Sequence, residues 1–357
     1  MRVNFLLIQT SVGDYRQQVL SLLKSKLKTD FQVRCGKNYF YPSLKTGVNI
    51  GSNLVLIKNR FLFNRRFLWQ SDVIWSGIRT KNIILEFNPR ILSNWIILIF
   101  RFILGKKTAL WGHAWSRSGQ QASTEWIRKI MRIFADTIIV YTEKQKKELQ
   151  SVDIDRKVIA APNSIYRREE MYSVGDHVSR KSFIYVGRLV PEKKVQLLIN
   201  AFSVAELDNS YRLLIVGSGP DEAACKALTE RKKITHRVEF LGHVSDIERI
   251  RNLYALSLAS VSPGYAGLSI TQSISFGIPI IIADDEPHAP EIEAAIPNVN
   301  CIFFRSNNVN DLSRVLLSVA NDKEYWIGQS GQIVKNCQQK YSVELMCERL
   351  LQGFMYE

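Results

Sequence analysis

The chain has 357 residues, of which 46% are hydrophobic and 23% are charged, and its formal net charge is +15. This length suits two domains of ordinary size, and the hydrophobic content excludes a largely disordered chain. The positive excess favours an anionic partner, namely nucleic acid, an acidic membrane surface or a phosphorylated substrate. A solvated basic surface without a partner is the alternative.

The cysteines and the first residues indicate a cytoplasmic protein. The five cysteines include no C-x-x-C pair and are odd in number, which argues against a disulfide framework or a structural zinc site and fits a reducing compartment. The apolar residues 1–10 are too few for a secretory signal and have no cleavage site, so they predict a buried strand.

The first half of the chain alternates short apolar runs with helical patterns, which is typical of βα repeats and a parallel sheet. Helical patterns include residues 15–27 and 126–134. The predicted strands are residues 3–9, 53–57, 72–75, 82–86, 108–111, 137–141 and 157–161.

The most apolar stretch, residues 95–104, is about half as long as a membrane span and contains Arg101, so it predicts no transmembrane helix. The basic pair Lys106-Lys107 follows it. Two interpretations stay open: a buried helix, and a helix that rests on the inner leaflet of a membrane.

Residues 166–181 are polar and charged with almost no apolar periodicity, which predicts an interdomain linker. The βα alternation resumes after them, with predicted strands at 183–186, 212–216, 238–241, 257–261 and 279–282. We therefore expect an N-terminal domain over residues 1–165, the linker over 166–181, a C-terminal domain over 182–340, and a final helix within 341–357. Both domains are expected to be doubly wound α/β domains.

The segment Gly187-Arg188-Leu-Val-Pro-Glu-Lys193 follows the first strand of the second half. Ligands bind where strands end in open α/β sheets, and an Arg and a Lys five positions apart at such an edge can converge on a diphosphate. A solvated basic pair is the alternative, but a helix N-terminus disfavours extra cations unless an anion is bound.

Residues 262–272 (SPGYAGLSITQ) form a glycine-rich loop between a predicted strand and a predicted helix. The free N–H groups at a helix start are suited to binding an anion. An ordinary βα turn is the alternative interpretation.

These two segments resemble the motifs of family 4 (group 1) glycosyltransferases. The resemblance implies the GT-B fold, with two Rossmann-like domains facing a central cleft, and transfer of a sugar from a nucleoside-diphosphate sugar with retention. It also implies that the final helix, Val343 to Phe354, crosses back onto the N-terminal domain. It covers residues 182–316 and is thinner before residue 163. Because Gly187, Arg188 and Lys193 match the family's G-R-L-x-x-x-K motif, it implies that Arg188 and Lys193 are catalytic residues that hold the donor diphosphate.

The resemblance also implies a set of donor contacts. His243 follows the strand predicted at 238–241, Glu291 stands in a Pro-Glu pair after the next strand, and Gly13 lies in the loop after the first strand. The glycine-rich loop supplies Gly264, Tyr265, Ala266, Gly267 and Leu268, and the helix after it supplies Gln272.

The chain departs from the family pattern at two of these positions. The family usually carries two glutamates separated by seven residues, and this sequence has Gly264 and Gln272 in their places. Gln272 can still hydrogen-bond a ribose hydroxyl, whereas Gly264 has no side chain, so we expect the loop to act mainly through backbone amides.

Three candidate residues lie at strand ends in the N-terminal half. His113 follows a predicted strand, and the resemblance implies a catalytic place near the donor sugar, with a histidine packed between aromatic residues as the alternative. Arg16 and Glu86 are candidates for contact with the acceptor.

No metal and no cofactor is expected besides the nucleotide sugar as co-substrate. The tripeptide Asp153-Ile154-Asp155 is similar to a D-x-D metal motif, but such tripeptides are frequent by chance and this one lies between a helix and a strand. Arg188 and Lys193 would supply the positive charge that a divalent ion supplies elsewhere.

The expected partners are the nucleotide sugar, a glycan or lipid-linked glycan of cell-surface polysaccharide or lipopolysaccharide biosynthesis, and an anionic membrane in peripheral contact. Nucleic acid is not expected, because the Lys and Arg residues are spread along the chain rather than gathered in a recognised module. Two alternatives stay open: a GT-B nucleotide-sugar epimerase, and a non-catalytic protein that binds nucleotides or membranes.

Overall fold

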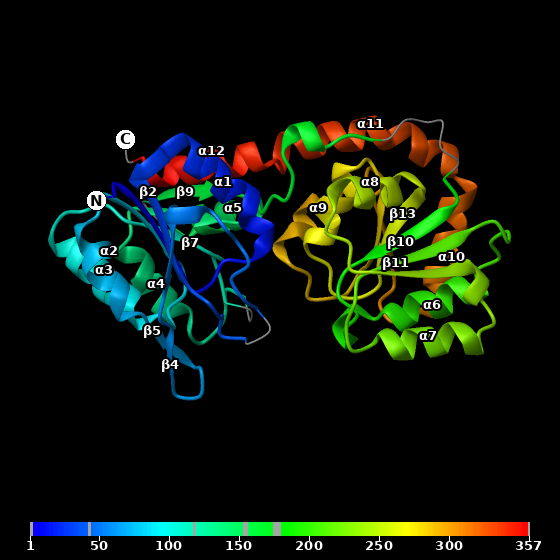
Figure 1. Ribbon diagram of the computed structural model, residues 1–357, viewed down its shortest axis with the longest axis horizontal. Coiled ribbons are helices and arrows are strands. Elements are labelled where there is room, and N and C mark those ends of the chain that lie inside the picture. The colour runs from blue at the N-terminus through cyan, green and yellow to red at the C-terminus, as the bar shows by residue number, and fades with distance from the viewer. Residues whose placement is uncertain (1–2, 42–43, 117–118, 153–155, 174–179, 356–357) are drawn as a thin grey trace. The chain divides into compact units, whose positions relative to one another are not determined.

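A computed structural model describes residues 3–355 except residues 42–43, 117–118, 153–155 and 174–179. The chain divides into two compact units. The first unit contains residues 1–165 and 343–357, and the second contains residues 166–342. Each unit has a parallel sheet with helices on both of its faces (Figure 1).

The first unit has a seven-stranded parallel sheet in the order β3-β2-β1-β6-β7-β8-β9. The direction in which successive strands are added to the sheet reverses between β1 and β6. These two strands are paired directly, and Phe5 lies opposite Asn82. The strands are β1 (Phe5–Gln9), β2 (Phe31–Gly36), β3 (Leu54–Ile57), β6 (Asn82–Glu86), β7 (Ala109–Trp111), β8 (Thr137–Val140) and β9 (Lys157–Ala160).

Successive side chains of a strand point to opposite faces of the sheet, and each face of this sheet has its own apolar cluster. Leu7 packs with the helices α1 and α12, whereas its neighbours Leu6 and Ile8 pack with α3, α4 and α5. The helices are α1 (Gln17–Leu27), α2 (Ile74–Arg79), α3 (Leu92–Ile103), α4 (Glu125–Ile133), α5 (Glu143–Ser151) and α12 (Val343–Phe354).

Helix α12 comes last in the chain but belongs to the first unit. It lies beside α1 (Figure 1). The ring of its Phe354 packs edge-on against Phe5 with 5.5 Å between ring centroids. A Cβ on Gly353 would lie 2.3 Å from Cδ1 of Ile139, so the helix backbone rests directly on β8 and a larger residue there would not fit.

The second unit has a six-stranded parallel sheet in the order β12-β11-β10-β13-β14-β15, which reverses between β10 and β13. The strands are β10 (Ser182–Val186), β11 (Arg212–Val216), β12 (Val238–Gly242), β13 (Ser257–Ser262), β14 (Ile280–Ala283) and β15 (Cys301–Phe304). Helices α6 (Val195–Val204), α7 (Glu222–Arg231) and α10 (Val309–Asn321) cover one face. Helices α8 (Ile247–Ala255), α9 (Leu268–Ser275) and α11 (Lys323–Lys340) cover the other.

The strand predicted at residues 72–75 is wrong, because these residues form a short 3-10 turn and the start of α2. Helix α2 packs closely on α3 at Gly77, where a Cβ would lie 2.8 Å from Cδ1 of Ile97. Side-chain packing on α3 therefore overrides the short apolar run, which by its pattern suits a strand. A small antiparallel hairpin of β4 (Arg60–Leu62) and β5 (Phe67–Trp69) precedes α2 and was not predicted.

The apolar stretch at residues 95–104 is a helix with one buried and one exposed face. Ile97 and Leu98 are buried, whereas Phe100 and Ile103 are exposed. Arg101 is fully buried and donates hydrogen bonds to Thr108 and to backbone carbonyls, including those of the turn that ends α2. Within the described part of the chain, no helix is both long and apolar enough to cross a bilayer.

The described residues of the predicted linker belong to the second unit. Tyr166 is buried there, and its hydroxyl accepts a hydrogen bond of 2.7 Å from Nε2 of Gln272. The boundary between the units therefore falls between Ile165 and Tyr166.

Candidate functional site

In the second unit, the loops that follow β10 and β13 meet at the carboxyl edge of the sheet, where the strand order reverses. This is the place where open α/β sheets bind their ligands. Nζ of Lys193, in the turn after β10, donates a 2.6 Å hydrogen bond to the carbonyl of Tyr265, which follows β13. The amide of Tyr265 in turn donates to the carbonyl of Glu192.

The turn after β10 is packed tightly against the turn after β11. Gly217 has a φ of +137°, and a Cβ there would lie 1.8 Å from the carbonyl oxygen of Gly187. Only glycine fits such a backbone conformation at that distance. Gly187 donates to the carbonyl of Val216, so the edge of the sheet presents backbone rather than side chains at this point.

Arg188 and Lys193 differ in their surroundings. Arg188 exposes 61% of its side chain and lies 3.9 Å from Glu192, a contact too exposed to hold it firmly. Lys193 is partly buried, and its ammonium lies 4.8 Å from the centre of the Tyr265 ring. Burial and the nearby Arg188 lower the pKa of Lys193 to about 8. A bound diphosphate would reverse this shift, because a neighbouring anion favours the ammonium form.

The loop after β13 requires glycine at position 264. A Cβ there would lie 2.4 Å from the carbonyl oxygen of Glu192 and 3.0 Å from the carbonyl carbon of Lys193. Gly264 is therefore a point of close backbone approach, and in this loop conformation the position has no room for the glutamate that the family usually carries.

Backbone amides at the start of α9 are directed toward the same edge. As the first residues of a helix, Gly267 and Leu268 have no intrahelical acceptor for their N–H groups. The amide of Ala266, by contrast, donates a 3.0 Å hydrogen bond to Nδ1 of His288. The amides of Gly267 and Leu268 can therefore donate hydrogen bonds to an anion. The Ala266 amide instead ties the loop to His288.

Glu291 and Gln272 flank this loop. Glu291 is buried, and its Oε2 lies 3.9 Å from where a Cβ of Gly267 would be. Its negative charge partly opposes the lowering of the Lys193 pKa by burial and Arg188. Gln272 donates from Nε2 to the hydroxyl of Tyr166 and accepts a long bond of 3.5 Å from the hydroxyl of Tyr254. Tyrosines of the same unit therefore already engage both ends of the Gln272 amide.

His243 lies at the same edge but further along the sheet. It is exposed and follows Gly242, which ends β12 with a φ of +64°. The carbonyl of Gly242 accepts a bond from the amide of Gly217. His243 is thus placed two strands away from Lys193 in the sheet order, on the far side of β11.

The first unit also gathers its candidate residues at a carboxyl edge. Oε2 of Glu86, at the end of β6, accepts a 2.7 Å hydrogen bond from the amide of Thr10, which follows β1. Oε1 of Glu86 accepts a bond from Asn88. Gly13 lies in the loop after β1, where a Cβ would collide with the ring of Tyr15.

Arg16 is buried rather than presented to a ligand, with 6% of its surface exposed. Its guanidinium lies 4.1 Å from the centre of the Trp111 ring and donates to Oε1 of Gln9 and to the hydroxyl of Tyr141. The ring of Tyr141 packs edge-on against the exposed ring of His113 at 4.8 Å. Arg16 therefore reaches His113 through Tyr141.

Among the described residues, no group of three or more His, Cys, Asp or Glu side chains is arranged to hold a metal ion. The Asp153-Ile154-Asp155 tripeptide lies outside the described residues. All five cysteines are buried as free thiols.

The sequence interpretation missed three residues that shape this edge of the second unit's sheet. His288 holds the amide of Ala266, and Lys194 forms an ion pair with Glu286, which comes from the loop after β14. No motif marks these residues. The only available signal is their position in the loops that follow strands β10 and β14, where ligand groups collect.

Residues 167–336 match the family described as glycosyl transferases group 1. An uncharacterised glycosyltransferase of Haemophilus influenzae is 22% identical over 275 residues, which are 74% of this chain and 75% of that protein. The lipopolysaccharide 1,6-galactosyltransferase of Salmonella typhimurium is 33% identical over 109 residues, 29% of this chain and 30% of that protein.

The structure of Anabaena HepE in complex with UDP superposes with a TM-score of 0.71 at 15% identity and covers 99% of both chains. This likeness identifies the fold as GT-B. Residues 167–336, just under half of the chain, are therefore similar to the group 1 glycosyl transferases, the chain has the GT-B fold, and together these findings support a glycosyltransferase.

Proposed function

We propose that the second unit binds a nucleoside-diphosphate sugar and that the protein transfers the sugar, with retention as in family 4, to a glycan or lipid-linked glycan. The observation that carries this proposal is the meeting of Lys193, Arg188 and the amides of Gly267 and Leu268 at one sheet edge. The similar structure of Anabaena HepE contains UDP, and one similar protein is a lipopolysaccharide galactosyltransferase, which supports the proposal.

The difficult step is departure of the diphosphate while positive charge develops at the anomeric carbon. Lys193, Arg188 and the two amides would stabilise the leaving group without a metal ion. Removing one preorganised donor of this kind typically costs about 3 to 4 kcal/mol of barrier. In the first unit, His113 would be a catalytic residue, and Glu86 would accept a hydrogen bond from the acceptor hydroxyl in place of the one from the Thr10 amide.

Ligand-induced thermal stabilisation tests the donor site. UDP, GDP, dTDP, ADP and CMP would be added to the wild type, to Arg188→Ala and to Arg231→Ala, an exposed arginine at the end of α7 that serves as the matched control. One nucleoside diphosphate should stabilise the wild type and the control by about 2.7 kcal/mol at a hundred times its dissociation constant. Equal stabilisation of Arg188→Ala would remove Arg188 from the site, and no stabilisation by any nucleotide would favour a non-catalytic protein.

Product analysis separates transfer from the epimerase alternative. With the stabilising nucleotide sugar and a lipid-linked acceptor fraction, a transferase produces free nucleoside diphosphate in step with glycosylated acceptor. Conversion of the nucleotide sugar without any acceptor would indicate the epimerase instead.

The proposed membrane partner rests on how the charge is distributed. Residues 31–124 contain 14 Lys and Arg but only two carboxylates, Asp72 and Glu86. The cations are spread evenly along the chain, as the sequence interpretation held, but the carboxylates are not. Most of the +15 charge therefore belongs to this part of the first unit, where an anionic surface would be attracted.

Exposed apolar side chains accompany this charge on α3 and α4. The two helices are joined at Phe102 and Phe134, whose rings pack edge-on at 5.3 Å. The outer faces of these helices, with Leu104 after α3, expose Ile99, Phe100, Phe102, Ile103, Leu104, Trp126, Ile130 and Ile133. We call these eight residues the α3–α4 face. Apolar side chains of this kind insert at the boundary between headgroups and acyl chains.

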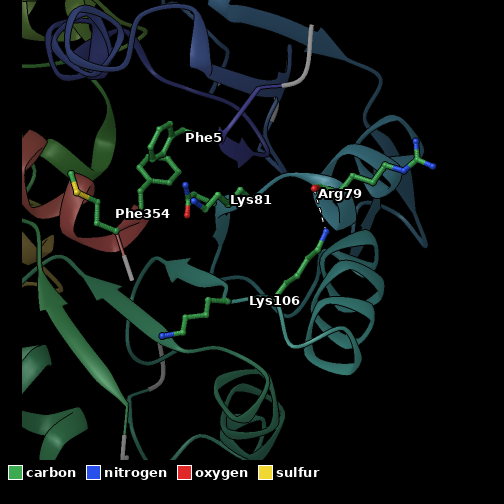
Figure 2. A pocket seen from close by; sticks show the side chains of 8 residues that line it. Phe5, Arg79, Lys81, Lys106 and Phe354 are labelled. Carbon is green, nitrogen blue, oxygen red and sulfur yellow. Dashed lines mark hydrogen bonds between the residues drawn. The ribbon is translucent and has the colours of Figure 1, made fainter. Parts of the chain in front are cut away.

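A basic pocket of about 640 Å³ adjoins the end of α3 (Figure 2). Phe5 and Phe354 line one side of it, and Lys106 reaches across its rim to donate to the carbonyl of Arg79. Its lining residues are Phe5, Arg79, Lys81, Asn82, Lys106, Lys107, Phe354 and Met355. A cationic pocket beside exposed apolar side chains suits an anionic lipid headgroup.

Vesicle sedimentation tests this partner. The wild type should bind vesicles rich in phosphatidylglycerol and not those of phosphatidylcholine alone. Phe100→Ser with Ile103→Ser should lose the binding, while the control pair Val204→Ser with Leu256→Ser, which is also exposed but lies in the second unit, should keep it. Retained binding by the Phe100/Ile103 variant, or binding to DNA that outcompetes the vesicles, would overturn the membrane assignment.

A further inference from the structure

The donor loop is held by a histidine from the next strand's loop. Nδ1 of His288 accepts a 3.0 Å hydrogen bond from the amide of Ala266, and Nε2 of the same ring lies 2.8 Å from the carbonyl oxygen of Ala283. The amide of Ala289 donates to the carbonyl of Ala266, so the two loops are also joined through backbone.

These two contacts fix the protonation state of the ring. A carbonyl oxygen only accepts, so Nε2 must carry a hydrogen, and a backbone N–H only donates, so Nδ1 must be bare. Both bonds exist together only for neutral His288 with its hydrogen on Nε2. Protonation would set an N–H of the ring against the N–H of Ala266.

The bond to Ala266 acts directly on the anion-binding amides. Ala266 immediately precedes Gly267 and Leu268, and a Cβ on Gly267 would lie 3.2 Å from Cβ of Ala289. The loop carrying His288 is fixed in turn by the ion pair between Glu286 and Lys194. The charged side chains on the segments packed around the ring are Asp284, Asp285, Glu286, Glu291, Glu293, Glu192, Lys193 and Lys194.

We propose that neutral His288 is a positioning residue of the donor site. It holds Ala266 so that the amides of Gly267 and Leu268 face the diphosphate, and its protonation releases the loop and weakens donor binding. This inference rests on the proposed binding of a nucleoside diphosphate by the second unit. It adds a pH-sensitive element that the family motifs do not contain.

Variants that each keep one half of the contact test this role, with UDP or whichever nucleotide stabilises the wild type as the probe. In His288→Asn the side-chain oxygen replaces Nδ1 and can still accept from Ala266. In His288→Gln the amide nitrogen replaces Nε2 and can donate to Ala283, and His288→Phe keeps neither bond. His236→Asn, an exposed histidine before β12 at the opposite edge of the sheet, is the matched control.

Calorimetric affinity would be measured at neutral and at mildly acidic pH. We expect about three- to tenfold weaker binding by His288→Phe, the range that one neutral hydrogen bond accounts for, with His288→Asn near the wild type at neutral pH. On acidification the wild type and His236→Asn should lose more affinity than His288→Asn, whose amide takes up no proton; protonation of the nucleotide phosphate weakens binding by all of these proteins alike. A KM for the donor that rises in His288→Phe while the KM for the acceptor stays constant would support the same role.

Two outcomes would overturn the inference while leaving the donor site intact: equal affinity of His288→Phe and the wild type, or equal loss of affinity on acidification in His288→Asn and the wild type. Failure of the wild type itself to bind any nucleotide would instead overturn the proposed function. Thermal unfolding without ligand shows whether His288→Phe is folded. If His288→Phe does not fold, the comparison of His288→Asn with the wild type on acidification still tests the inference.

Discussion

At the scale of single residues, Lys193 should make both protein stability and nucleotide binding at the proposed donor site depend on pH. Its ammonium donates to the Tyr265 carbonyl, and burial together with Arg188 lowers its pKa to about 8. In the unfolded chain the group titrates near 10.5. Between these two values the unfolded state binds more protons, so the free energy of unfolding of the unliganded protein should rise with pH there.

Donor binding should have the opposite pH dependence. A diphosphate favours the ammonium form, so affinity for the nucleotide should fall as pH rises above about 8, where Lys193 loses its proton. Lys193→Ala should bind weakly at every pH and lower the transfer rate by about 10² to 10³. Titration calorimetry across this pH range checks it, and an unchanged pH profile in Lys193→Ala would contradict the assignment.

Gly264 supports a prediction about stability. Gly264→Ala places a Cβ 2.4 Å from the Glu192 carbonyl, so the two turns must separate, and we expect a loss of about 1 to 3 kcal/mol in the free energy of unfolding. Gly264→Glu, which would restore the residue usual in the family, should be at least as destabilising and should not raise activity. Denaturant unfolding measures both variants.

Gly328→Ala is the control for this comparison. It lies in the interior of α11 with open space around its Cβ direction, so the same substitution should be neutral or stabilise by up to about 1 kcal/mol. A Gly264→Ala variant as stable as Gly328→Ala would show that the loop moves apart freely.

At the scale of elements, the sequence predicts the βα alternation and the glycine-containing turn after β10 well, because both depend on local patterns. The turn after β10 follows from a strand, a glycine and two cations within eight residues. Long-range packing accounts for what the sequence did not predict: α2 is a helix because Gly77 fits against α3, and Trp111 and Tyr141, far along the chain, enclose the guanidinium of Arg16. His288 was missed for the same reason, since its partner Ala266 is on another loop. Contact of Arg16 with the acceptor stays a prediction.

Helix α12 allows a prediction of its own. Leu350 is buried in the cluster that α12 shares with α1 and the sheet of the first unit. Leu350→Ala should therefore cost about 2 to 5 kcal/mol, and the loss should fall on the first unit. Denaturant unfolding followed by tryptophan fluorescence reports mainly on this unit, since six of the seven tryptophans lie in residues 1–165.

At the scale of the whole molecule, the two units have separate apolar clusters. Scanning calorimetry should show two transitions, one shifted upward by nucleotide and the other shifted downward by Leu350→Ala. A single transition that responds to both changes would mean that the units unfold as one cooperative body.

The return of the chain to the first unit has a consequence for synthesis on the ribosome. Residues 1–165 emerge first, but the face of their sheet that α12 covers stays bare until residues 343–354 have been made. The second unit, continuous in sequence, can fold during this interval, so the later half of the polypeptide should acquire its structure before the earlier half. A nascent chain that terminates before residue 343 would expose the apolar residues around Leu7 and Val19 that α12 normally covers. Chaperones and proteases recognise such a surface.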